Sequence, residues 1–312
     1  MTEFPPPPPH LDWQAEALWQ RLQPMLPGLS VEVLASVGST NATLLARARG
    51  EPDSTGGADG TPRLGRRQAD LQPALLVAEQ QTAGRGRLGR NWHSHADGPA
   101  DGRSPTPGAL PSLTFSFGMP QAPVDWSGLS LAVGCALADA LDPADDLAAN
   151  MAPALMLKWP NDLWLRDDDA PGGGRKLGGI LIETAPVGAQ RLVVVGIGLN
   201  VHVPAAPEPA QLSSGLGCVD ELDPAATPPA VLARVAPPLV QALRRFEAGG
   251  FAPFAAAFAR RDLLAGRPLR TQGAVVLEGT GAGVDSQGVL QLRMADGRLH
   301  GVGSGEVSVR PC

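Results

Sequence analysis

Apolar residues recur along the chain in short runs whose spacing predicts strands alternating with helices. A strand is predicted where a run is short and apolar, or where apolar and polar residues alternate, as in Leu113-Thr-Phe-Ser-Phe117. A turn at Val187-Gly188 separates two strand-like runs and predicts an antiparallel hairpin. The predicted strands span residues 73–78, 113–117, 155–157, 177–184 and 192–203.

Apolar residues at helical spacing predict helices between and after these strands. In the first helix, Leu11, Leu18 and Leu22 share one face, and Pro27-Gly28 ends the pattern. The run over 129–141 is apolar and rich in Ala, which predicts a buried helix. The predicted helices span residues 11–26, 42–49, 129–141, 228–246 and 251–264.

The pattern changes after Gly266. Short strands recur there between turn signals such as Asp285-Ser-Gln-Gly288 and Asp296-Gly297, which is typical of a small β-barrel or sandwich. We therefore expect a domain boundary near residue 264. The expected organisation is a disordered Pro-rich tail over 1–10, an α+β domain over 11–264 with a mixed central sheet and helices packed on one face, and a β domain over 265–312.

Composition adds a set of long loops to this picture. The chain has 38 glycines and 32 prolines among 312 residues, just below the share typical of low-complexity sequences. Many of them lie in loops predicted over 50–72, 96–111 and 167–174. Hydrophobic residues make up 43% of the chain, which is enough for a core. The net charge of −6 argues against a protein that coats nucleic acid.

Cysteine usage and targeting signals narrow the class further. Cys135, Cys218 and Cys312 lie far apart and form no CxxC pair, which excludes a disulfide scaffold and a cysteine-based zinc site. No run approaches the ~18–20 apolar residues of a membrane span. The N-terminus lacks the pattern of a signal peptide. We expect a cytoplasmic protein with no membrane partner.

The first motif that indicates chemistry is Gly84-Arg-Gly-Arg-Leu-Gly89. Its spacing matches the dinucleotide fingerprint, but that fingerprint needs a helix directly after the glycines. Here Arg90-Asn-Trp-His-Ser94 and a long polar loop follow, so we reject a dinucleotide site. Guanidinium groups on a tightly folding backbone favour binding of an anion. The alternative is a solvated basic turn.

Two further motifs contain polar groups at strand ends. Lys158-Trp-Pro-Asn-Asp162 predicts a rigid turn whose amide and carboxylate can bind a metal, a nucleotide or an amine; the alternative is an Asx-type turn. Arg175-Lys-Leu-Gly-Gly-Ile-Leu-Ile-Glu183 puts a lysine at the start of a buried strand beside two glycines, where a ligand can approach the backbone. The alternative for Lys176 is a lysine that extends to solvent.

The last two motifs concern a flat floor and a polar cluster. In Gly196-Ile-Gly-Leu-Asn200 the glycines alternate within a strand, which leaves a floor for a flat ligand; the alternative is a kink or bulge. Ser39-Thr-Asn41 precedes a helical pattern. It is a candidate hydrogen-bonding cluster for a polar ligand, and the alternative is a helix N-cap.

The order of these five motifs resembles the biotin–protein ligases. The resemblance covers residues 36–203, and residues 266–310 resemble the small SH3-like domain of that family. It implies the class II aminoacyl-tRNA-synthetase-like biotin/lipoate ligase fold, with an SH3-like β-barrel at the C-terminus. It also implies a two-step reaction. Biotin and ATP first give biotinyl-5′-AMP and pyrophosphate, with Mg²⁺. A lysine of the biotin carboxyl carrier protein of acetyl-CoA carboxylase then takes the biotin and releases AMP.

The resemblance also assigns expected site residues. Lys176, Arg85, Arg87 and Asp162 would be catalytic, and Asn161 and Asp162 would lie at the metal. The biotin and adenylate would be bound by Ser39, Thr40, Asn41, Gln81, Gly84, Arg85, Gly86, Arg87, Trp92, Lys176, Gly179, Gly198 and Asn200. Within this set, Ser39, Thr40 and Gln81 are expected at the polar edge of the biotin rings. Lys176 is expected to neutralise charge at the reacting carboxylate and α-phosphate.

Some features depart from the family pattern. Only about 35 residues precede Ser39, too few for the DNA-binding domain that bifunctional members carry, so no DNA partner is expected. Members also dimerise through a sheet edge, which leaves a homodimer open. The segment from Arg85 to about Pro111 is a candidate lid over the adenylate.

Three alternative functions fit the motifs less well. A lipoate–protein ligase or octanoyltransferase shares the fold, but the motifs disfavour it and no cysteine lies in a motif. A non-catalytic carrier-binding module is disfavoured by the intact Arg85, Arg87 and Lys176. An NAD-dependent oxidoreductase lacks the helix that must follow the glycines.

Overall fold

A computed structural model describes most of the chain. The described residues are 11–51, 71–92, 94, 110–143, 153–170, 172–204, 215–272, 276–303 and 308–311. The predicted Pro-rich tail, nearly all of the first two predicted loops and most of the candidate lid lie outside these residues.

A seven-stranded mixed sheet forms the centre of the larger unit. Its order is β1-β2-β3-β7-β6-β5-β4; β1 and β2 run parallel, and every other neighbouring pair is antiparallel. The long β6–β7 hairpin is the one predicted from the sequence. The strands are β1 (Ser30–Val37), β2 (Ala74–Gln81), β3 (Ser112–Pro120), β4 (Leu155–Lys158), β5 (Asp162–Arg166), β6 (Gly174–Val187) and β7 (Gln190–Asn200).

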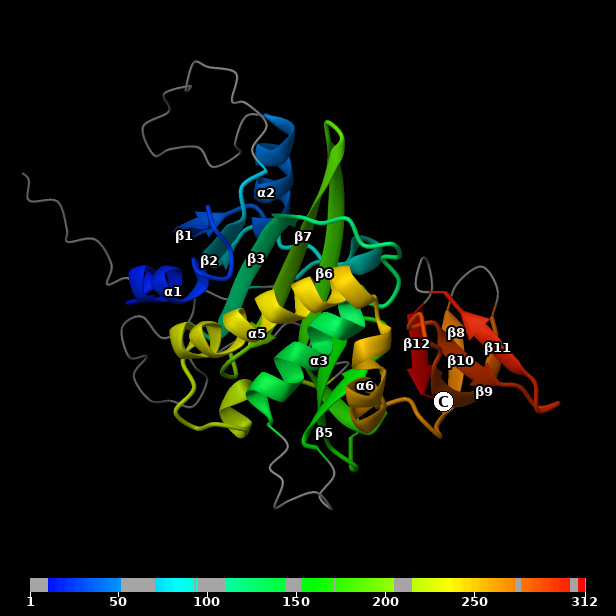
Figure 1. The fold of residues 1–312 in the computed structure, drawn as a ribbon. Helices are drawn as coiled ribbons and strands as arrows, with labels where there is room; N and C mark the ends of the chain where they lie inside the picture. Colours follow the sequence, from blue (N-terminus) through cyan, green and yellow to red (C-terminus); the bar gives the residue numbers. More distant parts are fainter. Residues whose placement is uncertain are drawn as a thin grey trace, which may run out of the picture.

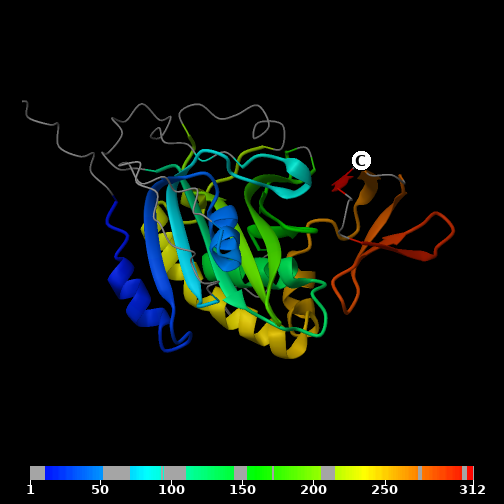
Figure 2. The same ribbon diagram turned by 90° about the horizontal axis from the view of Figure 1, so that it is seen from above.

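Helices cover both faces of this sheet. The larger layer, on one face, includes α3 (Leu129–Leu141), α5 (Pro228–Gly249) and α6 (Ala255–Arg261), as Figure 1 shows. Figure 2 shows α2 (Thr40–Arg49) on the opposite face from α5. The predicted mixed sheet with a helix layer is confirmed. The prediction that helices pack on one face only is corrected by α2, which lies on the other face. The remaining helix, α1 (Ala15–Leu22), packs at the β1 edge.

The apolar core follows this layering. Most buried apolar side chains form one cluster between the sheet and the α3–α5 layer, and it continues into the C-terminal unit through Leu269 and Leu290. A smaller cluster lies under α2 and joins Leu44 and Leu45 to Val194 of β7. The sheet therefore buries apolar residues along one whole face but only part of the other.

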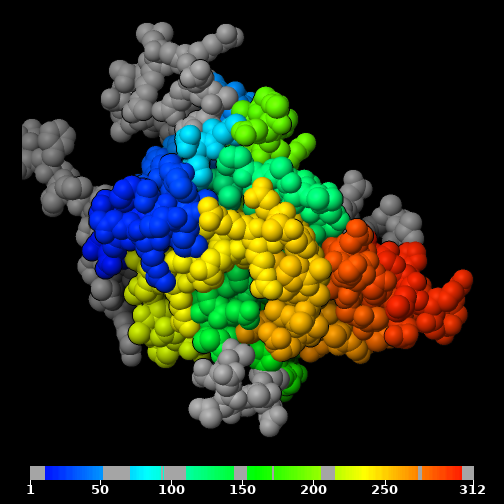
Figure 3. All heavy atoms as spheres, in the orientation of Figure 1, coloured from blue at the N-terminus to red at the C-terminus, as the bar shows by residue number. Residues whose placement is uncertain are grey.

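The C-terminal unit is a five-stranded antiparallel sheet. Figure 3 shows this unit, in orange to red, beside the helix layer. Its strand order is β11-β10-β9-β8-β12. The strands are β8 (Pro268–Gln272), β9 (Glu278–Val284), β10 (Leu290–Arg293), β11 (Leu299–Val302) and β12 (Ser308–Pro311). The small β unit after residue 264 is thus present, while the division of the chain into three domains stays a prediction.

Several element boundaries differ from the sequence prediction. The predicted helix over 251–264 is a short 3₁₀ turn (Ala252–Phe254) followed by α6, and the chain is extended at Asp262. The strand β1 was not predicted, because its residues are only partly buried and give no clear alternation. Among the described helices, none is long and apolar enough to cross a membrane.

Candidate functional site

The face of the sheet that carries α2 becomes polar below that helix. In the β3–β7 register Thr114 is opposite Gly198 and Ser116 is opposite Gly196, so these four residues point to the same side. The next pairings bring Gly179 opposite Gly198 and Asp162 opposite Gly179. One band across four strands therefore carries hydroxyls, glycines and a carboxylate.

The N-terminus of α2 supplies the first cluster on this band. Ser39 is the N-cap and accepts from the Ala42 amide at 3.5 Å, as the alternative interpretation of the motif predicted. The Gln81 Oε1 atom accepts from the Thr40 amide at 2.8 Å and from the Thr40 hydroxyl at 3.1 Å. Ser39 and Thr40 are both buried. The cap thus brings two hydroxyls and an amide side chain together at the floor of the site.

Asn41 extends this cluster across the sheet. The Ser116 hydroxyl lies 2.6 Å from both Thr40 Oγ1 and Asn41 Oδ1. Asn41 Nδ2 donates to Glu183 at 2.9 Å, and Arg85 pairs with the same carboxylate at 3.2 Å. A side chain on Gly196 would overlap the Asn41 amide, so that glycine makes room for this buried network.

The Gly-Arg segment folds as a tight hairpin. Gly86 and Trp92 donate their amides to the carbonyls of Arg90 and Gly84, with a 3₁₀ turn (Arg87–Gly89) at the tip. A Cβ on Gly84 would overlap the Trp92 carbonyl, which explains that glycine. No α-helix follows the glycines within residues 84–92, so the dinucleotide fingerprint is correctly rejected.

Trp92 is brought onto the glycine floor by this hairpin. Its indole occupies the space that a side chain at Gly198 would need. The Trp92 Nε1 atom is buried, and it has no hydrogen-bond partner within the described part of the chain. The flat surface predicted from the glycine pattern is therefore covered, at Gly198, by an aromatic ring.

The turn between β4 and β5 faces the same band. Asn161 Oδ1 accepts from Arg87 Nη1 at 3.3 Å, and Asn161 Nδ2 donates to the Ile180 carbonyl at 2.8 Å. Asp162 Oδ1 accepts from Lys176 Nζ at 2.9 Å. Burial lowers the pKa of the Arg87 guanidinium, and the nearby Asp162 carboxylate opposes this effect. Two neighbouring side chains of the motif thus each hold one cation: Asn161 holds Arg87, and Asp162 holds Lys176.

Lys176 reaches this face because β6 is irregular. Strict alternation from Gly179 would turn Lys176 to the apolar face. Between the pairs Leu163–Gly178 and Trp164–Lys176, however, β6 contains the extra residue Leu177. A bulge of this kind re-aims the following side chains. Lys176 therefore meets Asp162, with 29% and 21% of the two side chains exposed.

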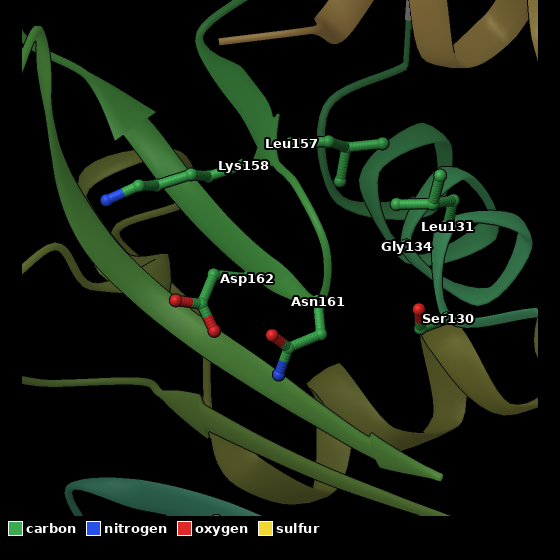
Figure 4. Close-up of a pocket in the computed structure, with 7 residues that line it drawn as sticks. All are labelled: Ser130, Leu131, Gly134, Leu157, Lys158, Asn161 and Asp162. Atoms are coloured by element: carbon green, nitrogen blue, oxygen red, sulfur yellow. The ribbon is translucent and has the colours of Figure 1, made fainter. Parts of the chain in front are cut away.

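A shallow hollow lies between this turn and the start of α3, and Figure 4 shows Asn161 and Asp162 side by side at it. Its lining also includes Ser130, whose hydroxyl donates to the Pro160 carbonyl at 2.8 Å, and Lys158. It has no room for even a water-sized sphere, so it is not by itself a ligand pocket.

The two predicted floor glycines differ in what surrounds them. A Cβ on Gly179 would lie 3.6 Å from both Asp162 Oδ1 and Lys176 Nζ, which is ordinary contact. Gly198, in contrast, is required by the Trp92 ring. Among the described residues, no atom lies so close to Gly179 that it requires a glycine there. We would expect the same of a position where a ligand, rather than the protein, approaches the backbone.

Asn200 lies two residues beyond Gly198 on β7, on the same face, and its side-chain hydrogen bonds are to main-chain groups. Its Nδ2 atom donates to the main-chain carbonyls of Lys176 at 3.2 Å and Gly217 at 3.3 Å. It therefore ties the backbone at Lys176 to the segment around Gly217. Direct contact of Asn200 with an adenylate stays a prediction.

Two residues of the site were not singled out from the sequence. Ser116 joins Thr40 to Asn41, and Glu183 joins Asn41 to Arg85. The alternation in 113–117 placed Thr114 and Ser116 on one face and was a usable signal for Ser116. Glu183 ends the motif that begins at Arg175, but the motif assigned it no role because its partners are distant in sequence.

Comparisons with known proteins point to one family. Residues 103–200 match the model of the biotin/lipoate A/B protein ligase family. A biotin–[acetyl-CoA-carboxylase] ligase from Mycobacterium tuberculosis is 35% identical over 89% of this chain and 88% of its own length. The chain belongs to the biotin protein ligase family. The bifunctional ligase/repressor BirA from Escherichia coli is 31% identical over 91% of this chain and 75% of its own length.

The fold of this family member also matches a solved biotin protein ligase. The structure from Aquifex aeolicus, in complex with biotin and ATP, superposes with a TM-score of 0.63 at 23% identity. The match covers 91% of this chain and 99% of the other. It supports the mixed sheet with an appended β unit as the family fold.

The cysteines of this ligase family member disfavour a thiol-based acyl transferase. Cys135 and Cys218 are buried, and burial raises the pKa of each thiol to about 12. Negative neighbours add to this effect, Asp139 at Cys135 and Asp220 at Cys218. A thiol with so high a pKa is protonated at neutral pH and is a poor nucleophile. Cys312 lies outside the described residues.

The two predicted metal ligands, Asn161 and Asp162, both have hydrogen-bond partners within the protein. Both amide atoms of Asn161 are engaged, by Arg87 and by Ile180, and one oxygen of Asp162 accepts from Lys176. Among the described residues, no group of three or more His, Cys, Asp or Glu could hold a metal ion. The metal role of Asn161 and Asp162 therefore stays a prediction.

Proposed function

We propose that this family member joins biotin to ATP as biotinyl-5′-AMP and then transfers the biotin to a lysine of the biotin carboxyl carrier protein of acetyl-CoA carboxylase. The observation that carries the proposal is the convergence of Arg87 and Lys176 on the Asn161–Asp162 turn. A buried polar cluster lies at the other end of the same glycine band. One end suits an uncharged polar ring, and the other suits two anions.

The polar cluster is the proposed site for the biotin rings. Thr40, Gln81 and Ser116 supply hydroxyl and amide groups on a buried floor. A ureido group has N–H donors and a carbonyl acceptor, so it needs this mixture of partners. Ser39 and Asn41 support the cluster from α2, and the Gly84–Trp92 hairpin closes one side.

The cationic end is the proposed site of adenylate formation. Joining a carboxylate to an α-phosphate brings two anions together, so the barrier falls when fixed cations offset their repulsion. Lys176 exchanges its ion pair with Asp162 for the reacting oxygens in this proposal. Arg87 and Arg85 hold the substrate's carboxylate and phosphates, and the guanidinium of Arg87 is already oriented by Asn161.

Transfer uses the same arrangement. The amine of the acceptor lysine attacks the biotinyl carbonyl, an amide bond forms, and the bond from the carbonyl carbon to the phosphate oxygen breaks. AMP leaves with the bonding electrons, and the amine loses its proton. The cations that balanced the mixed anhydride also stabilise the departing phosphate.

Magnesium, the partner and the location remain predictions. Mg²⁺ is usually held by substrate phosphates with one or two carboxylates, and Asp162 is the carboxylate nearest the reacting end. We assign no step to the ion. The carrier protein as acceptor, a homodimer and a cytoplasmic location are expected from the family resemblance alone.

Biotin-dependent exchange of radiolabelled pyrophosphate into ATP tests the proposal. We expect exchange with biotin but not with lipoate, and a fall of about 100-fold or more for Lys176→Ala. The control is Arg191→Ala, which removes an exposed cation whose contact is with Thr184 at the far end of the hairpin. Exchange with lipoate alone would identify a lipoate ligase, and exchange unchanged in Lys176→Ala would refute the role of that lysine.

A further inference from the structure

The C-terminal unit touches the catalytic unit at one of the motifs that carry the site. Trp159, in the Lys158–Asp162 motif, is 2% exposed. Its Nε1 atom donates to the Gly288 carbonyl of the C-terminal unit at 3.1 Å. This tryptophan is two residues from Asn161, yet the site described above does not use it.

The turn that receives this hydrogen bond is itself firmly held. Asp285 caps the turn over 285–288 by accepting from the amides of Gln287 at 2.9 Å and Val289 at 3.0 Å. Gly288 has a φ of 78°, and a Cβ there would lie 2.8 Å from the Cα of Gly128. The two backbones are therefore in close contact just before α3, which only a glycine in the left-handed region allows.

A second link joins the two units at the same place. Gln287 Nε2 donates to Asp125 Oδ2 at 3.1 Å, in an exposed position. The start of α3 then contacts the motif through Ser130, whose hydroxyl donates to the Pro160 carbonyl at 2.8 Å. The C-terminal turn, the start of α3 and the motif thus form one connected set of contacts.

This set bears on the reacting end of the site. The backbone of the motif is tied to β6, because the Ile180 amide donates to the Asn161 carbonyl at 2.9 Å. From the same short segment, Asn161 holds Arg87 and Asp162 holds Lys176. A displacement of Trp159 would therefore move the partners of both cations together.

We propose that Trp159 is a positioning residue through which the C-terminal unit takes part in adenylate formation. The inference rests on the proposed function, since it concerns the two cations assigned to that step. The hydrogen bond to Gly288 holds the indole, the indole holds the motif, and the motif sets Arg87 and Lys176. The polar cluster at Thr40, proposed for the biotin rings, lies on other strands, so this contact should affect the reacting end of the site more than the binding of the rings.

The test compares two variants with a matched control. Trp159→Phe removes the indole N–H but keeps an aromatic ring, and Gly288→Ala forces the turn away from Gly128. The control is Trp19→Phe, because Trp19 makes the same kind of bond, from Nε1 to the Leu29 carbonyl at 2.9 Å, far from the site. Steady-state pyrophosphate exchange gives kcat and the KM for biotin separately, and thermal unfolding gives Tm.

We expect kcat to fall about 10-fold or more in Trp159→Phe and Gly288→Ala, with a smaller change in the KM for biotin. Trp19→Phe should keep kcat, and it should lose less Tm than Trp159→Phe because Trp19 is 37% exposed and Trp159 only 2%. Amide hydrogen exchange adds a readout that needs no activity. The Ile180 amide, which is bonded to the motif, should exchange faster in Trp159→Phe than in Trp19→Phe or the parent protein.

Three outcomes decide the matter. An unchanged kcat in both site variants would overturn the inference and leave Trp159 as a contact that serves stability alone. An unchanged Ile180 exchange rate would also overturn it. If the parent and Trp19→Phe both lack biotin-dependent exchange, the proposed function fails, while the hydrogen-exchange comparison still decides whether Trp159 holds the motif.

Discussion

The two faces of strands β3 and β7 are built from adjacent residues and yet have opposite character. On the face toward α3 and α5, Phe115, Phe117 and Ile197 are buried in the main core. On the other face, one residue away, lie Ser116, Gly196 and Gly198. The first face consists of large apolar side chains, and the second has small polar side chains or none.

This contrast shows how one sheet supports both stability and binding. Burial of apolar area on the helix side supplies most of the favourable free energy, because that term scales with the area removed from water. The polar face then needs only to satisfy its own hydrogen bonds. The network from Gln81 to Arg85 supplies hydrogen bonds on that face, and the backbone at Gly179 stays open to a ligand.

The largest expected effect is on the apolar face. Phe115→Ala removes a fully buried ring. It should lower the free energy of unfolding by about 4 kcal/mol, because the change loses burial and leaves a cavity. Urea unfolding measures this, with the exposed Val203→Ala as the control. A loss below about 1 kcal/mol would break the assignment of stability to this face.

A buried carboxylate on the helix side gives the next effect. Burial raises the pKa of Asp262 to about 6, and its Oδ2 atom has no partner within the described residues. Since the folded pKa lies above the ordinary value of 3.8, the charged form costs stability above about pH 6. That cost is relieved as the pH falls through about 6 and is gone below 3.8.

The variant Asp262→Asn isolates this effect. Between about pH 7.5 and about pH 4.5, the unfolding free energy of the parent should rise relative to the variant by about 2 kcal/mol. Urea unfolding at the two pH values gives the difference and cancels any constant cost of the substitution. A difference that does not change with pH would contradict the prediction.

The next effect, of about 10-fold, is expected on the affinity for biotin when a side chain is added at one of the glycines on the polar face. Gly179→Ala places a Cβ in ordinary van der Waals contact with Lys176 and Asp162, so the Tm of the ligand-free protein should not change. If the ligand approaches the backbone there, affinity for biotin should fall about 10-fold. Calorimetric titration with biotin tests this, and unchanged affinity would remove Gly179 from the binding floor.

Gly198→Ala is the matched comparison for that variant. Its Cβ would overlap the Trp92 indole, so the ligand-free protein itself should change. Tryptophan fluorescence should shift for Gly198→Ala and not for Gly179→Ala. Identical spectra in both variants would contradict the placement of Trp92 on the floor.

The smallest effect is expected from the polar face beside Phe115. Ser116→Ala removes two short hydroxyl contacts, to Thr40 and Asn41. The free energy of unfolding should fall by about 1 kcal/mol, well below the loss for Phe115→Ala, while the KM for biotin rises. A stability loss equal to that of Phe115→Ala would erase the distinction between the two faces.

Much of the fold was predictable where the signal is local. The β6–β7 hairpin, the buried helix over 129–141 and the β unit after Gly266 were predicted from periodicity and turn residues. The strand β1 and the extended chain at Asp262 were not. In both places the pattern of burial is set by distant neighbours rather than by the segment's own spacing.

The site was predictable as a set of residues and not as a geometry. The motifs containing Thr40, Gln81 and Lys176 were recognisable in order along the chain. The placement of α2 on the opposite face from the main helix layer was not, nor was the role of Glu183 in joining Asn41 to Arg85. Those depend on which strands become neighbours.

The amino-acid sequence by itself determined the periodic elements, the positions of the glycines and the charged residues near them, because these features depend on residues close in sequence. Register and packing decided which side chains meet. The extra residue Leu177 turns Lys176 toward Asp162, and the docking of the C-terminal unit brings Gly288 to Trp159. Such contacts join residues 14 and 129 positions apart, so their energies appear only when the sheet and the two units are assembled.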